Sequence, residues 1–223
     1  MIAALLPVKT FSRSKDRLAG FLSPSERALL ARTMFEDVWE ALHEAQAAGG
    51  GLDRLLVVSS EPYVIARCRK FGIYCLEEED QLSHSDSVNL ATDWGMALGV
   101  TSVLSLPIDT PGVTSAEILE LLDLRHRFPV VIVPSADGLG TNALLRTPPD
   151  AIQPHFGPGS CRLHAQESEE NELSYLVFPS HGLANDIDTP DDLHNFVLMQ
   201  RPCRTMTLAM QLLAVDRGAA ICP

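Results

Sequence analysis

The sequence is short of basic residues and has neither a paired cysteine motif nor a long apolar run. Its 223 residues contain 17 lysines and arginines against 29 aspartates and glutamates, a formal net charge of −12. This acidity argues against nucleic-acid binding and against a basic membrane-surface helix, because phosphate backbones and anionic lipids select cationic surfaces. No stretch of about 18 apolar residues occurs, so no transmembrane helix is expected.

The five cysteines are scattered along the chain. No C-x-x-C pair occurs, which speaks against a zinc site or a dithiol redox motif. Reduced thiols in the cytoplasm are the simpler interpretation than a disulfide framework. The apolar start, residues 1–7, is too short for a signal peptide and lacks its charged leader. We therefore expect a cytoplasmic protein.

Short apolar runs alternate with longer amphipathic segments. This alternation predicts an α/β fold, with a single Rossmann-like, mainly parallel sheet and helices on both faces. Residues 1–200 form the predicted domain, and residues 201–223 a helical tail of the same domain. Strands are expected at 2–6, 54–59, 73–76, 103–106, 129–134, 143–146 and 174–178. Helices are expected at 24–48, 61–71, 86–98, 114–124, 160–170 and from 190 onward.

Cations gather in the loop after the first predicted strand, at Lys9, Arg13, Lys15 and Arg17. Residues 1–32 carry six basic and two acidic side chains, a local excess of +4 in an acidic protein. Ligands of open α/β sheets bind at the edge where such loops lie. These side chains can hold a triphosphate and neutralise the charge of a leaving pyrophosphate. The alternative is a solvated basic loop.

Three aspartates are candidate metal ligands. Asp109 follows the fourth predicted strand, at the same sheet edge as the cationic loop. Asp186 and Asp188 stand at i and i+2, so in an extended segment their side chains point the same way. Like charges that face each other favour a divalent cation between them. The alternative is that these carboxylates only cap a turn or start a helix.

Two glycine-rich segments complete the candidate site. Residues 137–142, with Ala143 after them, contain G-x-G-x-x-A, but this follows the fifth strand instead of the first, so it is no dinucleotide fingerprint. It could present backbone N–H groups and a hydroxyl to a small anion. Residues 156–160 precede a helix for which Ser160 is the expected N-cap, with His164 one turn further on. Neither a Walker A sequence nor a G-x-S-x-G elbow occurs, which speaks against a P-loop NTPase and an α/β-hydrolase.

In this order, the motifs resemble the CofC/FbiD guanylyltransferases of coenzyme F420 biosynthesis. The resemblance covers about residues 2 to 195. It rests on Pro7-Val8-Lys9 with Lys15-Asp16-Arg17-Leu18, Leu22-Ser23 with Glu26-Arg27, Leu106-Pro107-Ile108-Asp109, Asp137-Gly138-Leu139-Gly140-Thr141-Asn142, Phe156-Gly157-Pro158-Gly159-Ser160 and Asp186-Ile187-Asp188-Thr189-Pro190.

The resemblance implies a nucleotidyltransferase of glycosyltransferase-A-like type that transfers GMP from GTP to the phosphate of a three-carbon acid and releases pyrophosphate. Acceptors in the family are 2-phospho-L-lactate, phosphoenolpyruvate or 3-phospho-D-glycerate. The resemblance implies Mg²⁺ on Asp109, Asp186 and Asp188, with Lys9 and Lys15 facing the GTP phosphates. Catalytic roles fall to Lys9, Lys15 and Asp109. The substrate-binding residues implied are Arg17, Asn89, Gly140, Thr141, Asn142, Gly157 and Ser160.

Cys161 stands where the family often has phenylalanine, which predicts room for a larger acid such as 3-phosphoglycerate. Two other readings stay open. One is a different nucleotidyltransferase, of cytidylyl or molybdopterin guanylyl type. The other is a GTP-binding regulatory protein that has lost catalysis. The sequence allows a homodimer without deciding the oligomeric state.

Overall fold

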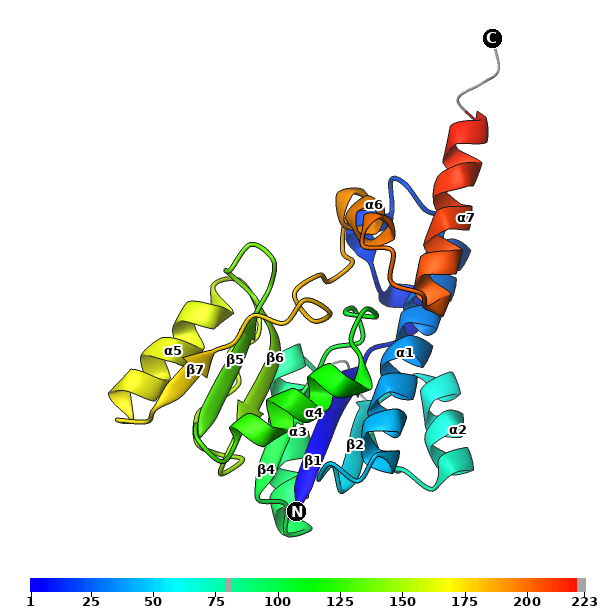
Figure 1. Cartoon of the computed structure of the whole chain (residues 1–223). Coiled ribbons are helices and arrows are strands. Elements are labelled where there is room, and N and C mark those ends of the chain that lie inside the picture. Colours follow the sequence, from blue (N-terminus) through cyan, green and yellow to red (C-terminus); the bar gives the residue numbers. More distant parts are fainter. Residues whose placement is uncertain (79–81, 220–223) are drawn as a thin grey trace.

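The computed structural model describes residues 1–78 and 82–219, with side chains to residue 214. Its strands form one seven-stranded sheet in the order β3-β2-β1-β4-β6-β5-β7, as Figure 1 shows. The strands are β1 (Ile2–Val8), β2 (Arg54–Ser59), β3 (Tyr74–Glu77), β4 (Ser102–Ser105), β5 (Val130–Pro134), β6 (Thr141–Arg146) and β7 (Tyr175–Val177). The predicted mainly parallel sheet is confirmed, since only β6 runs against its neighbours.

The interior strand β1 pairs in parallel with β2 on one side and β4 on the other, so that Leu5 lies opposite both Leu56 and Ser105. The crossover helices are α1 (Pro24–Ala47), α2 (Pro62–Phe71) and α3 (His84–Ala97). The chain first builds outward from β1 to β3 and then returns to add β4 on the opposite side of β1. This reversal is a topological switch point, where the loops after β1 and β4 leave a crevice.

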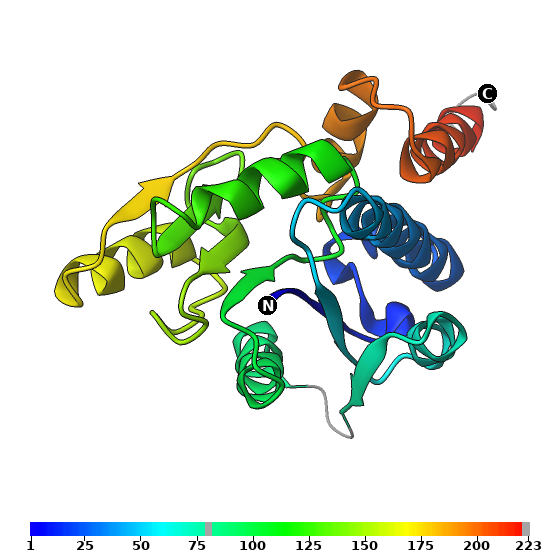
Figure 2. The ribbon, with the colours of Figure 1, turned by 60° about the horizontal axis from the view of Figure 1, so that its bottom comes forward.

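Helices cover both faces of the sheet, as predicted. Ile2, Ala4, Leu6 and Val8 of β1 join the larger core cluster, which contains buried residues of α1, α2 and α4 (Ser115–Leu124). Alternate residues of β1 point to the opposite face and meet α3. A third cluster joins β5 and β6 to α5 (Ser160–Glu170). Figure 2 shows the layers, with α1 and α4 above the sheet and α3 below it.

Local capping chemistry sets the helix starts, as the sequence indicated. Ser23 and Glu26 form the expected capping box at α1, with Pro24 in the first turn. The same box recurs at Thr114 before α4 and at Thr189 before α6 (Pro190–Leu198). Each side chain satisfies backbone N–H groups that have no partner inside the helix.

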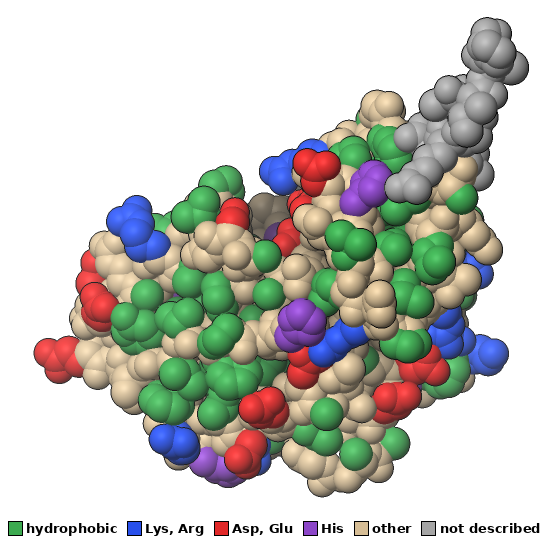
Figure 3. Space-filling model, turned by 45° about the horizontal axis from the view of Figure 1, so that its top comes forward, with side chains coloured by type: hydrophobic (Ala, Val, Ile, Leu, Met, Phe, Trp, Pro, Cys, Tyr) green, Lys and Arg blue, Asp and Glu red, His purple; other side chains and the backbone are tan. Residues whose placement is uncertain are grey.

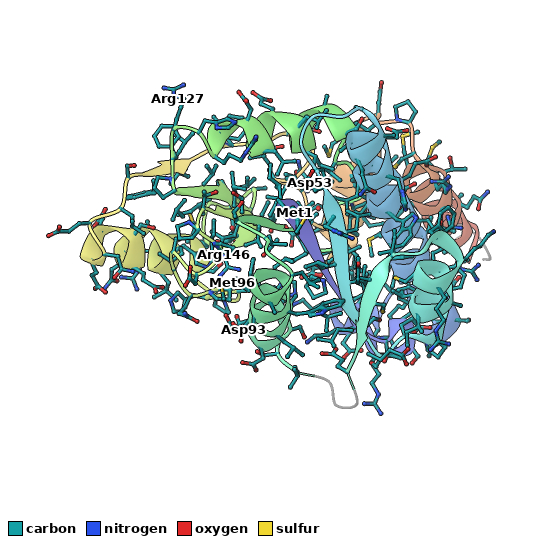
Figure 4. The ribbon with its side chains drawn as sticks, turned by 90° about the horizontal axis from the view of Figure 1, so that it is seen from below. Met1, Asp53, Asp93, Met96, Arg127 and Arg146 are labelled. Carbon is teal, nitrogen blue, oxygen red and sulfur yellow. The ribbon has the colours of Figure 1, made fainter. Side chains whose placement is uncertain are left out.

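The end of the sheet opposite the crevice is seen from below in Figure 4. Met1 and the buried Arg146 lie at this end. The Ile2 backbone N–H donates to Asp53 Oδ2 at 2.7 Å, and Met1 lies beside Asp53 in Figure 4. Arg146 of β6 is buried, donating to Thr92 Oγ1 of α3 at 2.8 Å and to the Ile152 carbonyl at 3.0 Å. Arg146 therefore ties β6 to α3 at the end of the sheet away from the crevice.

The predicted C-terminal helix is α7 (Arg204–Ala219), which lies along α1 and projects beyond the sheet in Figure 1. Asp37 of α1 starts it: its carboxylate is 5% exposed and accepts from the backbone N–H groups of Arg204 and Thr205 at 3.2 and 2.7 Å. Among the described residues, no helix combines the length and the apolar character needed to cross a membrane. The division into residues 1–200 and 201–223 stays a prediction.

We expect Asp37→Ala to lower the free energy of unfolding by about 1–3 kcal/mol, because it leaves the buried N–H of Thr205 and the partly buried N–H of Arg204 without an acceptor. Urea denaturation measures this loss. Glu40→Ala is the matched control, since it removes the other, exposed carboxylate partner of Arg204 and should cost less than about 1 kcal/mol. Equal losses in the two variants would contradict the capping role of Asp37.

Candidate active site

Two adjoining cavities open at the switch point, above the carboxyl ends of β1 and β4. The first is about 400 Å³ and is lined by the loop after β1. The second is about 750 Å³ and extends toward β6 and α5. They share Arg17, His84, Pro107, Asp109 and Asp188. Figure 3 brings this edge forward and shows a hollowed surface with acidic and basic side chains around it.

The predicted cationic loop lines the first cavity. It contains two short 3₁₀ turns, η1 (Phe11–Arg13) and η2 (Asp16–Leu18). Lys9, Arg13, Lys15 and Arg17 all border the cavity. The Arg17 side chain is 73% exposed, whereas Lys15 is only 6% exposed. The loop is therefore more than a solvated surface segment, because one of its cations is held inside the site.

Lys15 lies between two of the predicted metal ligands. Its Nζ is 3.3 Å from Asp109 Oδ2 and 2.9 Å from Asp188 Oδ1. Burial lowers the pKa of Lys15, but the two carboxylates outweigh it and hold the pKa above its usual value. Burial raises the pKa of Asp188, but Lys15 and Arg17 bring it below its usual value. Lys15 and Asp188 are therefore both charged at neutral pH.

The backbone of Lys15 has a φ of 61°, in the left-handed region that side chains other than glycine rarely adopt. Such a conformation costs about 1–3 kcal/mol and persists where the surroundings enforce it. Here the ion pairs to Asp109 and Asp188 hold the side chain inward. Backbone strain at the residue that bridges Asp109 and Asp188 marks this loop as part of the site.

Asp186 has a different partner from Asp188. Its Oδ1 accepts from Asn142 Nδ2 at 3.0 Å, and the same amide donates to the Leu183 and Ala184 carbonyls. Burial raises the pKa of Asp186, and the charges of Asp109 and Asp188 add to this rise. The backbone N–H of Ile187 donates to the Asp109 carbonyl at 3.0 Å, which joins the two aspartate segments.

Within residues 1–78 and 82–219, no three acidic, histidine or cysteine side chains come together in an arrangement that could hold a metal ion. The expected ligation by three aspartates is thus not preformed. Two carboxylates do converge on one cationic atom, Lys15 Nζ. Carboxylate oxygens are the donors that Mg²⁺ prefers, and Mg²⁺ usually completes its coordination with phosphate oxygens and water. The donor chemistry at Asp109 and Asp188 therefore fits Mg²⁺ that arrives with a nucleotide.

The glycine-rich turn at 137–140 borders the second cavity, but its N–H groups are not free for an anion. Asp137 accepts from the backbone N–H of Leu139 at 2.9 Å, and Ser135 Oγ accepts from that of Gly140 at 2.7 Å. The Ser135 carbonyl accepts from Gly138. The expected anion cradle of backbone N–H groups is therefore wrong for this turn. Its role is to place Thr141 and Asn142 at the start of β6, where both line the cavity.

Gly157, Gly159 and Ser160 form another wall of the second cavity. Gly157 and Gly159 have φ values of 135° and 72°, which only glycine adopts without strain. The N-cap of α5 is Gly159, so the predicted capping role of Ser160 is wrong. Ser160 is instead the first helical residue, and its buried Oγ has no hydrogen-bond partner among the described residues. An orphaned hydroxyl at a cavity wall suits a ligand.

His84 is the main site residue that sequence reasoning missed. It begins α3, lines both cavities, and packs edge-to-face against Phe156 with ring centroids 4.5 Å apart. Burial lowers its pKa to about 4, although the charge of Asp109 opposes this. Its ring is therefore neutral at pH 7. The only signal in the sequence was its place near the start of a helix after the third strand, which does not distinguish it from other histidines.

Two residues that were expected to contribute to the substrate site do not line either cavity. Asn89 lies within α3 and lines neither of them. Cys161 is 9% exposed and packs into the third core cluster with Val130 and Ile132. Its small side chain therefore does not enlarge the second cavity directly, contrary to expectation.

A second ion cluster holds the segment that carries Asp186 and Asp188. Glu117 of α4 accepts from the Gly182 backbone N–H at 2.7 Å and from Ser180 Oγ at 3.1 Å. Arg201 Nη1 lies 2.8 Å from Glu117 Oε2. Burial raises the pKa of Glu117, but the hydrogen bonds from Arg201, Gly182 and Thr114 outweigh it and lower the pKa to about 2.

A family model described as "Guanylyl transferase CofC like" matches residues 2–209 of the chain. The chain belongs to this CofC-like family. It is therefore an enzyme of the nucleotidyltransferase class. The match spans both cavities and all three aspartates, which agrees with the resemblance inferred from the motifs.

Three relatives of this CofC-like chain have names that differ in the acceptor. A phosphoenolpyruvate guanylyltransferase of Conexibacter woesei is 37% identical over 193 residues, covering 85% of this chain and 84% of that protein. A 2-phospho-L-lactate guanylyltransferase of Methanothermobacter thermautotrophicus is 36% identical, covering 87% and 83%. A 3-phospho-D-glycerate guanylyltransferase of Colwellia psychrerythraea is 32% identical, covering 89% and 92%.

The fold of the CofC-like chain also matches that of a solved nucleotidyl transferase from Methanothermobacter thermautotrophicus. The TM-score is 0.63 at 17% identity, over 88% of this chain and 95% of the other. At this identity the likeness concerns the fold alone. It confirms the predicted nucleotidyltransferase architecture.

The lowered pKa of Glu117 predicts that the free energy of unfolding depends on pH. Because its folded pKa of about 2 lies below its ordinary value of 4.5, its contribution is complete above about pH 4.5 and is lost as the pH falls toward 2. We expect Glu117→Gln to cost about 1–3 kcal/mol at pH 7. The gap between wild type and variant should narrow as urea titrations move from about pH 5 to pH 3.

Glu120→Gln is the control, because Glu120 is an exposed carboxylate on the same helix. It should leave the free energy of unfolding within about 0.5 kcal/mol of wild type at every pH. A Glu117→Gln gap that stays constant down to pH 3 would show that Glu117 is not held ionised by this cluster.

Proposed function

We propose that the protein transfers GMP from GTP to the phosphate of a small three-carbon phospho-acid and releases pyrophosphate, as a step of coenzyme F420 biosynthesis. The observation that carries the proposal is the pair of adjoining cavities, one cationic and one lined by hydroxyl groups, that share Asp109 and Asp188. A cytoplasmic location is part of the proposal. It is supported by the free thiols of Cys68, Cys75, Cys161 and Cys203.

In this proposal the first cavity takes GTP. The ammonium and guanidinium groups of Lys9, Arg13 and Arg17 line it and suit the negative charge of a triphosphate. The neutral ring of His84 lies at the boundary with the second cavity. The cations therefore face the end of the nucleotide where pyrophosphate leaves.

The second cavity takes the acceptor acid. Thr141 and Ser160 supply hydroxyl groups, and Leu139 and Phe156 supply apolar surface. Five aspartates and Arg17 also line this cavity, so an anionic acceptor needs Arg17, or Mg²⁺ on the aspartates, to offset their charge. With that offset, the hydroxyl and apolar groups suit a small molecule with anionic oxygens and a short carbon skeleton. Phosphoenolpyruvate, 2-phospho-L-lactate and 3-phospho-D-glycerate are the candidates, because relatives of 37, 36 and 32% identity are named for them.

The reaction needs no covalent enzyme intermediate. A phosphate oxygen of the acceptor forms a bond to the α-phosphorus of GTP, and the bond from that phosphorus to the bridging α–β oxygen breaks. Pyrophosphate leaves with the electron pair. The protein contributes by holding the two phosphates in line and by neutralising the charge that develops on the leaving group. Lys15 is suited to the second task, because its ammonium is already inside the site and remains charged.

Mg²⁺ is part of the proposal. Asp109 and Asp188 would hold it together with phosphate oxygens, and Asp186 is the nearby third carboxylate. When bound, the metal supplies charge neutralisation at the reacting phosphates. Lys15 contacts both ligating carboxylates in the structure described here, so we expect this ammonium to shift when nucleotide and metal enter.

An acceptor and nucleotide panel tests the proposed function. GTP, CTP and ATP are each incubated with Mg²⁺ and one of the three acids, and pyrophosphate release is measured. We expect release with GTP that depends on an added acid. Release with CTP in preference to GTP would indicate a cytidylyltransferase. GTP binding without release for any acid would indicate a regulatory protein.

Asp109→Asn and Asp188→Asn test the shared carboxylates. Each should lower the rate of pyrophosphate release on the order of a hundredfold or more, because each removes charge that orders the reacting phosphates. Asp191→Asn is the control, since Asp191 is exposed and lines neither cavity. Circular dichroism should show all three variants folded. Near-normal rates in the first two would reject the assignment.

A further inference from the structure

Thr141 and His164 form a buried pair at the wall of the second cavity. Thr141 Oγ1 lies 3.0 Å from His164 Nδ1. His164 belongs to α5 and is 0% exposed, while Thr141 is 7% exposed and lines the cavity. The histidine therefore lies behind the threonine hydroxyl and does not itself line the cavity.

The second nitrogen of the ring fixes its protonation. The backbone N–H of His155 donates to His164 Nε2 at 2.8 Å, and a backbone N–H can only donate. Nε2 must therefore carry a lone pair, and the proton of the neutral ring lies on Nδ1. Burial, together with the charges of His155 and Arg146, lowers the pKa of His164 to about 3. The ring thus stays neutral at physiological pH.

This tautomer determines what the Thr141 hydroxyl can do. His164 Nδ1–H donates to Thr141 Oγ1 and occupies one of its lone pairs. The threonine proton cannot point back at the histidine, and the described residues offer it no other acceptor within hydrogen-bond distance. It therefore points toward the cavity. Ser160, whose Oγ is also without a described partner, lies on the same cavity.

The surroundings of His164 hold this arrangement in place. His155 Nε2 lies 2.5 Å from Glu167 Oε2. Glu167 also accepts a hydrogen bond from the backbone N–H of Gln153. These contacts fix the backbone that donates to His164. Phe156 packs against the His164 ring at 5.6 Å and lines the cavity in front of it. The ring therefore has little freedom to rotate or change tautomer.

We propose that His164 is a positioning residue that orients the Thr141 hydroxyl as a hydrogen-bond donor toward an anionic oxygen of the acceptor acid. It acts only through Thr141 and does not touch substrate. A hydroxyl oriented in advance binds an anion without first having to break a competing hydrogen bond. The role of the acceptor rests on the proposed function, whereas the tautomer and the direction of the hydroxyl do not.

A double-mutant cycle separates this role from a merely structural one. Thr141→Val should raise the KM for the acceptor roughly ten- to hundredfold, the loss expected for a hydrogen bond to a charged group. His164→Leu should raise it in the wild-type background, but by less than about threefold when Thr141→Val is already present. The KM for GTP should change by less than about twofold in all variants. Equal effects of His164→Leu in both backgrounds would overturn the proposal.

Two further variants guard against misfolding. His164→Asn keeps an N–H donor close to the position of Nδ1 and should restore most of the acceptor affinity that His164→Leu loses. His126→Asn is the matched control, because His126 is exposed after α4, and it should behave as wild type. Failure of His164→Asn to exceed His164→Leu, with both folded by thermal melting, would also overturn the proposal.

The tautomer is tested directly on the wild-type protein with ¹⁵N-labelled histidine and no ligand. At pH 7 we expect His164 to show a protonated Nδ1 and an unprotonated Nε2. An imidazolium or the opposite tautomer would overturn the proposal even in an active enzyme. Conversely, the absence of acceptor-dependent pyrophosphate release would reject the proposed function while leaving the expected tautomer to be confirmed or refuted by this spectrum.

Discussion

The site exists because β1 pairs in parallel with a strand on each of its sides. That pairing requires crossovers, and the crossovers carry the chain outward to β3 before it returns to β4. The loops after β1 and β4 then start side by side with no helix between them. One loop brings Lys15 and the other Asp109, and the crevice between them becomes the two cavities. Both cavities depend on this reversal in strand order.

The contact of Lys15 with Asp109 and Asp188 joins three separate segments of the chain. Removing an ammonium from water is costly, and a buried lysine is tolerated only where carboxylates compensate. The compensation here is mutual, since the same lysine offsets repulsion between two carboxylates at one sheet edge. The contact keeps the carboxylates converged without a metal and places a permanent cation where a leaving pyrophosphate would need one.

The second cavity differs from the first in the groups that line it. Arg17 and five aspartates line part of it, whereas the wall formed by Thr141 and Ser160 offers neutral hydroxyl groups. The direction of the Thr141 hydroxyl is set by a hydrogen bond from behind this wall. Backbone N–H groups of the 137–140 turn are consumed by Asp137 and Ser135, so the turn is rigid and anion recognition passes to hydroxyls. Glu117 and Arg201 hold the opposite wall, because they fix the segment that leads to Asp186 and Asp188.

Much of this could be predicted from the sequence by itself. Apolar runs, capping boxes and glycine stops are local signals, so the strands, the helix starts and the α/β class follow from neighbouring residues. The position of Asp109 and of the cationic loop at one sheet edge follows as well, because parallel strands present their carboxyl ends together. The motifs in order were enough to indicate the family.

Only the tertiary structure decided how the side chains combine. Ser160 proved to be a helical residue and not the cap, Asn89 lines neither cavity, and His84 lines both, because cavity lining depends on how distant elements pack. Lys15 meets both aspartates through contacts across 94 and 173 positions. The tautomer of His164 depends on a backbone N–H from another segment. Spacing along a chain determines local structure, whereas burial, charge pairing and hydrogen-bond direction are set by neighbours that only folding brings together.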